Sequence, residues 1–388
     1  MFPRIYLALD NCFASKRWTQ PHEWMQIARE AGVFAIEASA DNECDPLYNT
    51  PETLNDWLKA VESATEQSGV RVVNLYSGHG TYATLGLAHH DVRVRDHIQH
   101  HWLEPMIRSA HRLNAGLGFF CHAFAQSVLA EPSRYAAALD DLTRRLGELA
   151  QFAQRTGLNS LSVEQMYSPH QIPWTVRGTQ DLLQTVYRQQ HTPLYITLDT
   201  GHQVGQRRHL RPTLEAVQAE LASRQQGKPS TGIWLGAHAD SINDLDILIQ
   251  SLDARPYLFA AAEDGDLYHW LRMLGSYSPI IHLQQTDGNA SAHRPFNAQQ
   301  NQTGIVTGEA VLQALYDGYR QPVHDGYPPR CTDLYLTLEL FSGTAEHPTQ
   351  IIRSIQDSVA YWRRFIPQDG LPLDQLINRL PASHPAAK

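Results

Sequence analysis

The chain has 388 residues, of which 42% are hydrophobic and 18% charged, and its formal net charge is −9. This balance excludes intrinsic disorder, coiled coil and collagen, and it indicates a globular protein with a well-buried core. Nucleic-acid binding depends on clustered positive charge, so an acidic chain favours no nucleic-acid partner.

The sequence gives no sign of a membrane or of a disulfide framework. No apolar run reaches the ~18–20 residues that a membrane span needs, and the first residues lack the anatomy of a signal peptide. We therefore expect no membrane partner and a cytoplasmic location. The four cysteines form no C-x-x-C pair and are predicted to be free thiols; they are Cys12, Cys44, Cys121 and Cys331.

Short apolar runs alternate with longer segments of helical period from one end of the chain to the other. Each run is bounded by polar residues or glycine, which is typical of strands buried on both faces of a parallel sheet. The predicted strands are Ile5–Leu9, Phe34–Glu37, Arg71–Tyr76, Gly118–Cys121, Ser160–Glu164, Leu194–Asp199, Pro279–Leu283 and Leu334–Leu340.

Helices are predicted between these strands. Thr50 and Pro51 supply the start of one helix and Gly69 its end, through side-chain capping, a fixed proline φ and a left-handed glycine. The predicted helices are Gln20–Ala31, Pro51–Ser68, Arg93–Leu113, Ser133–Thr156, Gly178–Gln190, Glu309–Gly318 and Thr349–Phe365. A succession of eight βα units predicts an α/β fold, a (β/α)8 TIM barrel, with a doubly wound sheet as the alternative.

The barrel is predicted to carry one long insertion. The spacing between strands doubles after Asp199, so residues 205–265 are predicted to be an insertion after strand six, with a further strand-like run at Gly232–Ala237. Residues 1–367 then form a single domain, and residues 368–388 a loosely held tail. The insertion could build an interface in a homo-oligomer or close over the pocket, and the sequence favours neither.

Polar side chains lie at the ends of these strands, where TIM barrels place their active sites. Taken singly, each is most simply a hydrogen-bonded residue of the rim. The residues are Asp10, Glu37, His79, His122, Glu164, Asp199, His202, His282, Gln284, Gln285, Asp287 and Glu339.

Three of these carboxylates have a special setting. Glu164, Asp199 and Glu339 each end a buried apolar run, and a buried carboxylate is costly unless it is paired or bound to metal. Together with His282 they should converge on one mouth, where a cation would relieve their mutual repulsion. The sequence therefore predicts a metal site.

The order of these residues resembles that of the xylose isomerase-like TIM barrels, a superfamily of sugar and sugar-phosphate isomerases and epimerases that has apurinic endonuclease IV as a cousin. The most specific match is Leu-Asp-Thr-Gly-His, in which Asp199 and His202 fit the family's D-x-x-H after strand six. Glu164, His282 and Glu339 match the residues after strand five, on strand seven and ending strand eight. The resemblance extends from Arg4 to about Phe365.

The resemblance implies that Glu164, Asp199, His282 and Glu339 ligate one divalent cation, Mn²⁺, Mg²⁺ or Co²⁺, while the single imidazole leaves Zn²⁺ open. It also implies that Glu164 and Glu339 lie on opposite faces of the substrate and act as acid and base through an enediolate. Return of the proton to the same carbon would epimerise it, and return to the neighbouring carbon would interconvert aldose and ketose. The expected substrate is a small ketose or ketose phosphate, such as a tetrulose or its phosphate.

Further residues are expected to bind the substrate. The resemblance implies that His202 holds an oxygen near the carbonyl; Arg294 is a candidate for a hydroxyl or phosphate, and Glu37 for a hydroxyl. His79 and His122 resemble additional zinc ligands of the endonuclease IV branch, but the aspartate that this branch needs after strand seven is missing at Ser291-Ala292-His293. We therefore expect His79 and His122 to contact substrate or to support the ligands.

Three alternatives stay open. One is a zinc phosphodiesterase that acts on DNA, and another is a metal-dependent dehydratase or lyase on the same fold. The third is a catalytically silent barrel that binds sugars.

Overall fold

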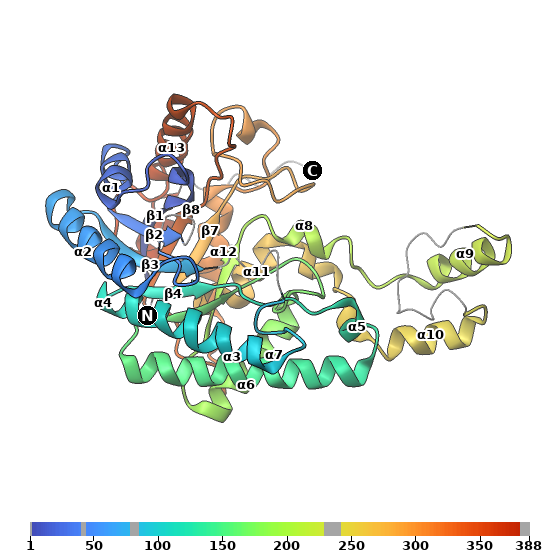
Figure 1. Cartoon of the computed structure of the whole chain (residues 1–388). Coiled ribbons are helices and arrows are strands. Elements are labelled where there is room, and N and C mark those ends of the chain that lie inside the picture. Colours follow the sequence, from blue (N-terminus) through green and yellow to red (C-terminus); the bar gives the residue numbers. More distant parts are fainter. Residues whose placement is uncertain (1, 40–43, 78–84, 229–241, 381–388) are drawn as a thin grey trace.

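Eight parallel strands pair in sequence order, and β1 pairs with both β8 and β2, which closes the sheet into a barrel (Figure 1). This computed structural model describes residues 2–39, 44–77, 85–228 and 242–380. The strands are β1 (Arg4–Asp10), β2 (Ala35–Ser39), β3 (Arg71–Ser77), β4 (Gly116–Phe119), β5 (Leu161–Glu164), β6 (Tyr195–Asp199), β7 (Ile280–Leu283) and β8 (Asp333–Leu338). The predicted TIM barrel is confirmed, and the alternative of a doubly wound sheet is wrong.

The strand register places the ends of the strands at one level. Asp199 pairs with His282 between β6 and β7, and Asp10 pairs with Glu37 between β1 and β2. Polar residues from different parts of the chain therefore meet at the same end of the barrel.

Helices cover the outside of the barrel. The longer ones are α1 (Pro21–Glu30), α2 (Pro51–Ser68), α3 (Val92–Ile98), α4 (Glu104–Arg112), α6 (Pro132–Thr156), α7 (Val176–Gln190), α11 (Leu267–Leu274), α12 (Gly308–Arg320) and α13 (Pro348–Arg363). Short helical segments are Asn11–Ala14, α5 (Gln126–Leu129), α8 (Gln203–Gln206), Pro256–Leu258, Ala262–Gly265, Gly275–Tyr277 and Gln300–Gln302. Thr50 caps α2 as predicted, by accepting a hydrogen bond from the N–H of Thr53, and Gly69 ends it with a φ of 73°.

The helix predicted over Arg93–Leu113 runs without a break, but it is not α-helical throughout. A π-helical segment, Gln99–Leu103, separates α3 from α4. Pro105 has no N–H to close an ordinary α-helical turn, so the turn before it can widen.

The core lies between the strands and the surrounding helices. Its largest members are four tryptophans with almost no exposed surface, Trp24, Trp102, Trp270 and Trp362. Cys12, Cys44 and Cys121 are buried and Cys331 is half-buried, and none of the four forms a disulfide. Among the described residues, no helix is long and apolar enough to cross a membrane.

An insertion follows strand six, where the sequence predicts one. Two of its helices, α9 (Leu214–Gln225) and α10 (Leu245–Asp253), form an arm that extends away from the barrel (Figure 1). Both helices bury leucines, among them Leu221 on α9 and Leu252 on α10. The strand-like run predicted at Gly232–Ala237 lies outside the described residues.

The C-terminal segment is more ordered than the sequence suggests. Leu371–Pro372 (β9) pairs antiparallel with the first residues of β1, and α14 (Leu373–Ile377) follows. Leu373 and Leu376 are fully buried. The expectation of a loose tail from residue 368 is therefore wrong as far as residue 380, because these leucines pack against the barrel at the end opposite the polar cluster.

Candidate active site

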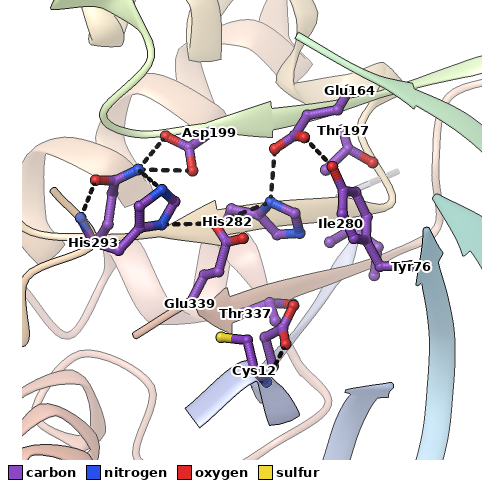
Figure 2. A network of polar contacts seen from close by, with 12 residues as sticks. Cys12, Tyr76, Glu164, Thr197, Asp199, Ile280, His282, His293, Thr337 and Glu339 are labelled. Atoms are coloured by element: carbon purple, nitrogen blue, oxygen red, sulfur yellow. Dashed lines mark hydrogen bonds and ion pairs between the residues drawn. The ribbon is translucent and has the colours of Figure 1, made fainter. Parts of the chain in front are cut away.

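Glu164, Asp199, His282 and Glu339 meet at the carboxyl ends of β5, β6, β7 and β8, and Figure 2 shows the three carboxylates around the imidazole. Each offers one ligand atom that lies within 4.8 Å of the other three. Asp199 and His282 have no exposed surface, and Glu164 and Glu339 are 2% and 6% exposed. Buried carboxylates this close together need positive charge between them.

His282 lies at the centre of the cluster. Its Nδ1 is 3.0 Å from Oε1 of Glu164 and 3.4 Å from Oε2 of Glu339, while its Nε2 is 2.8 Å from Oε2 of Glu37. Burial opposes the charged imidazolium, but Glu339 and Glu37 together raise the pKa of His282 well above its ordinary value. The protonated ring thus offsets part of the negative charge.

Asp199 is held by donors from its own loop and from the next strand. Its Oδ1 accepts hydrogen bonds from the N–H groups of Gly201 at 2.6 Å and His202 at 3.1 Å. The Nε2 of Gln284 lies 2.8 and 3.0 Å from the two carboxylate oxygens. Although burial opposes ionisation, His202 and other nearby histidines lower the pKa of Asp199.

Glu339 is less well satisfied. Its Oε2 lies 3.1 Å from Nδ1 of His293, but neither atom makes an aligned hydrogen bond with a described residue. Burial raises the pKa of Glu339 above its ordinary value. A buried carboxylate oxygen without a donor is costly, and a cation would complete its coordination.

The four side chains fit a divalent cation. Three carboxylates and one imidazole form an oxygen-rich donor set, which suits hard divalent ions and tolerates zinc. Oε2 of Glu339 supports this fit, since it makes no aligned hydrogen bond with a described residue that a cation would have to break.

Two contacts at the cluster were not singled out from the sequence. Tyr76 donates its hydroxyl hydrogen to Oε2 of Glu164. Its ring lies edge-on to that of His282, with ring centroids 5.4 Å apart. The ring of His293 stacks on that of Phe341, with ring centroids 3.8 Å apart. The sequence gives no direct signal for Tyr76, because the register shift between β2 and β3 interrupts the alternation of β3 before it.

Two of the predicted substrate-binding residues lie against the cluster. His202 is 1% exposed; its Nδ1 lies 2.6 Å from the carbonyl oxygen of Gln165 and its Nε2 lies 3.8 Å from Oδ1 of Asp199. Glu37 is fully buried and contacts His282.

The other predicted substrate-binding residues are placed differently. His122 is fully buried beside Phe120 and Phe124, its Nε2 bonds the carbonyl oxygen of Ile172, and burial lowers the pKa of His122 to about 4. The guanidinium of Arg294 lies 3.0 Å from the carboxylate of Asp287 and is one-third exposed. His79 lies outside the described residues.

The family model for the xylose isomerase-like TIM barrel matches residues 25–247. The chain belongs to this family. A sequence relative of the chain, the D-erythrulose 1-phosphate 3-epimerase of Brucella abortus (strain 2308), is 30% identical over 116 residues, which is 30% of this chain and 34% of that one. The match thus spans about a third of the length of that relative.

Solved structures share the family fold. A provisionally assigned xylose isomerase from Rhodospirillum rubrum ATCC 11170 superposes with a TM-score of 0.68 at 18% identity, covering 93% of this chain and 99% of that one. D-Psicose 3-epimerase with D-tagatose from Clostridium cellulolyticum H10 has a TM-score of 0.53 at 11% identity, covering 92% and 98%. At these identities the superpositions show the fold, and the family match shows that the chain is a xylose isomerase-like TIM barrel.

Proposed function

We propose that the protein is a metal-dependent isomerase or epimerase of a small ketose or ketose phosphate. The convergence of Glu164, Asp199, His282 and Glu339 within one buried cluster carries this proposal. The named activity of the Brucella abortus relative supports a tetrulose or its phosphate as a member of the substrate class.

The same four residues would hold the cation, for which Mn²⁺, Mg²⁺ and Co²⁺ suit the donor set and Zn²⁺ is compatible with it. When bound, the cation would polarise the substrate carbonyl and its neighbouring hydroxyl and make the carbon acid between them easier to deprotonate. The remaining steps, proton transfer and substrate binding, are carried out by side chains of the protein.

Glu164 and Glu339 are the proposed acid–base pair. Both oxygens of Glu164 are engaged by protein donors, Tyr76 and His282, whereas Oε2 of Glu339 is not hydrogen-bonded by a described residue. One glutamate would take the proton from the carbon next to the carbonyl, leaving an enediolate, and the other would return a proton. Return from the opposite face gives the epimer, and return to the neighbouring carbon gives the aldose–ketose pair.

His202 is the proposed contact for a substrate oxygen. A carbonyl oxygen is an acceptor only, so Nδ1 must donate to Gln165. In the uncharged ring Nε2 is then an acceptor, suited to a substrate hydroxyl.

Arg294 is proposed to bind a hydroxyl or phosphate of the substrate. Its guanidinium is paired with Asp287 and one-third exposed, which leaves some of its N–H groups for a ligand. A cytoplasmic location and association into homo-oligomers remain predictions from the sequence.

The test is turnover of a panel of ketoses and ketose phosphates in deuterated water, with each divalent cation in turn. We expect deuterium at the carbon next to the carbonyl in the epimerised or isomerised product. Loss of water or carbon–carbon cleavage with the same labelling would instead support the dehydratase or lyase alternative. No conversion of any ketose by the cation-loaded protein would reject the proposed function.

A further inference from the structure

The sequence makes Glu37 a candidate for binding a substrate hydroxyl, but the surroundings of its side chain favour another role. Its carboxylate has no exposed surface. Oε2 lies 2.8 Å from Nε2 of His282, and Oε1 accepts a hydrogen bond from Nδ2 of Asn74 at 2.6 Å. Both oxygens are thus engaged by the protein itself.

The sheet places Glu37 there through an irregularity in strand pairing. Between β2 and β3 the register shifts after Ile36, so that Glu37 pairs with Asn74 and Val73 is skipped. Without the shift Glu37 would stand opposite Val73, and the side chain of Asn74 would point to the other face of the sheet. Such bulges occur beside active sites, where they redirect a side chain.

We propose that Glu37 is a positioning residue that fixes the ring of His282 for cation binding. His282 can bind a cation only when its ring is uncharged, and it then carries one N–H and one lone pair. Because a carboxylate accepts only, Glu37 holds the hydrogen on Nε2 and leaves the lone pair on Nδ1, the atom that faces Glu164 and Glu339. Carboxylates that bond the far nitrogen of a metal-binding histidine set its orientation in this way. The inference rests on the proposed function and deepens its cation site.

Asn74 makes this arrangement specific for a carboxylate. Its Nδ2 also donates to the carbonyl oxygen of Leu75 at 2.9 Å, so the amide nitrogen must face Glu37. A glutamine at position 37 would meet this donor with its oxygen and would turn its own NH₂ toward Nε2 of His282. That nitrogen would have to accept, and the hydrogen would move to Nδ1.

The experiment compares Glu37→Gln with the wild-type protein. Metal-free protein is titrated with Mn²⁺ or Co²⁺, and the tautomer of His282 is read from ¹⁵N chemical shifts of its ring. We expect cation affinity to fall about 10–100-fold and the uncharged ring to carry its hydrogen on Nδ1. Glu220→Gln is the matched control, because it removes another buried carboxylate, one on the arm, and should leave affinity unchanged.

A double variant, Glu37→Gln with Asn74→Asp, separates tautomer control from simple loss of a charge. The aspartate accepts from the glutamine NH₂, which turns the glutamine oxygen back toward Nε2–H. We expect part of the lost cation affinity to return, because the aspartate restores the tautomer but cannot donate to the carbonyl oxygen of Leu75. Failure of this rescue in a double variant that retains the wild-type melting temperature would overturn the tautomer mechanism.

Other outcomes are equally decisive. Unchanged cation affinity in Glu37→Gln with a raised KM for sugar would reassign Glu37 to substrate binding. A test without any variant is the Zn²⁺-loaded wild-type protein, in which His282 should keep its hydrogen on Nε2; a hydrogen on Nδ1 would contradict the proposal. A wild-type protein that binds cation but converts no ketose would reject the proposed function alone, whereas one that binds no cation would reject both.

Discussion

The amide nitrogen of Gln284 lies 2.8 and 3.0 Å from the two carboxylate oxygens of Asp199. The other end of the same amide accepts a hydrogen bond from the N–H of His293 at 2.7 Å. Gln284 therefore holds the carboxylate of Asp199 in one orientation and ties it to the loop that carries His293. A proposed cation ligand on β6 is oriented by a residue that follows β7.

Replacing Gln284 by methionine removes this donor at similar side-chain volume. We expect Gln284→Met to weaken cation binding about 10–100-fold, since partners behind the ligands have effects of that size. Calorimetric titration of metal-free protein measures this. Gln313→Met, on the exposed face of α12, is the control and should bind as the wild type does. Wild-type affinity in a folded Gln284→Met would show that Asp199 needs no such support.

The proposed acid–base pair predicts a loss of turnover without a loss of fold. In both Glu164→Gln and Glu339→Gln, kcat should fall about 10²–10⁴-fold, the range for removing a general acid or base. Exchange of the substrate carbon proton with solvent should fall in parallel, and circular dichroism should stay unchanged. Glu62→Gln, on α2 at the surface, is the control. Retention of wild-type kcat by either site variant would contradict the assignment.

The lowered pKa of the buried His122 predicts that the stability of the protein depends on pH. Burial lowers its pKa to about 4 in the folded protein, whereas an unfolded histidine titrates near 6.5. Between these values the unfolded chain binds a proton that the folded protein does not, so stability falls as pH falls through this window. Below pH 4 the contribution becomes constant.

Urea unfolding at pH 7 and pH 4.5 measures this effect. The wild-type protein should lose about 2–3 kcal/mol more than His122→Gln between the two pH values, at 1.36 kcal/mol per pKa unit. The exposed His22→Gln on α1 should behave as the wild type does. Equal losses in the wild type and in His122→Gln would show that His122 is not kept neutral in the folded state.

The C-terminal segment should contribute to stability. Leu376→Ala removes a fully buried side chain from α14 and should lower the free energy of unfolding by about 2–5 kcal/mol. Leu214→Ala, on the arm, removes one that is 50% exposed and should change it by less than about 0.5 kcal/mol. Similarly small effects for both would show that the packing of α14 does not contribute to stability.

Much of the fold could be predicted because each strand is a buried apolar run with its own local signal. The runs at Arg71–Tyr76 and Leu194–Asp199 differ from the observed strands by one residue at most. The C-terminal segment departs from the prediction because the prolines and alanines in its sequence favour a loose tail, whereas Leu373 and Leu376 form a short apolar face. Those two leucines become informative only once the end of the barrel that they cover is known.

The central cluster could be anticipated because Glu164, Asp199, His282 and Glu339 each stand at a strand end, and the barrel brings strand ends together. Their supporting residues could not. Asn74 reaches Glu37 only through a register shift, and His293 reaches Glu339 only through the path of a loop. Such contacts depend on register and loop closure, which leave no pattern in the sequence.

The central claim is most directly tested by elemental analysis of the purified protein and of Glu339→Gln after identical dialysis and reconstitution. The proposed site predicts about one divalent ion per chain in the wild type and a clear loss of it in the variant. No bound ion in the reconstituted wild-type protein would contradict the account, because the four residues would then form a polar network that holds no metal.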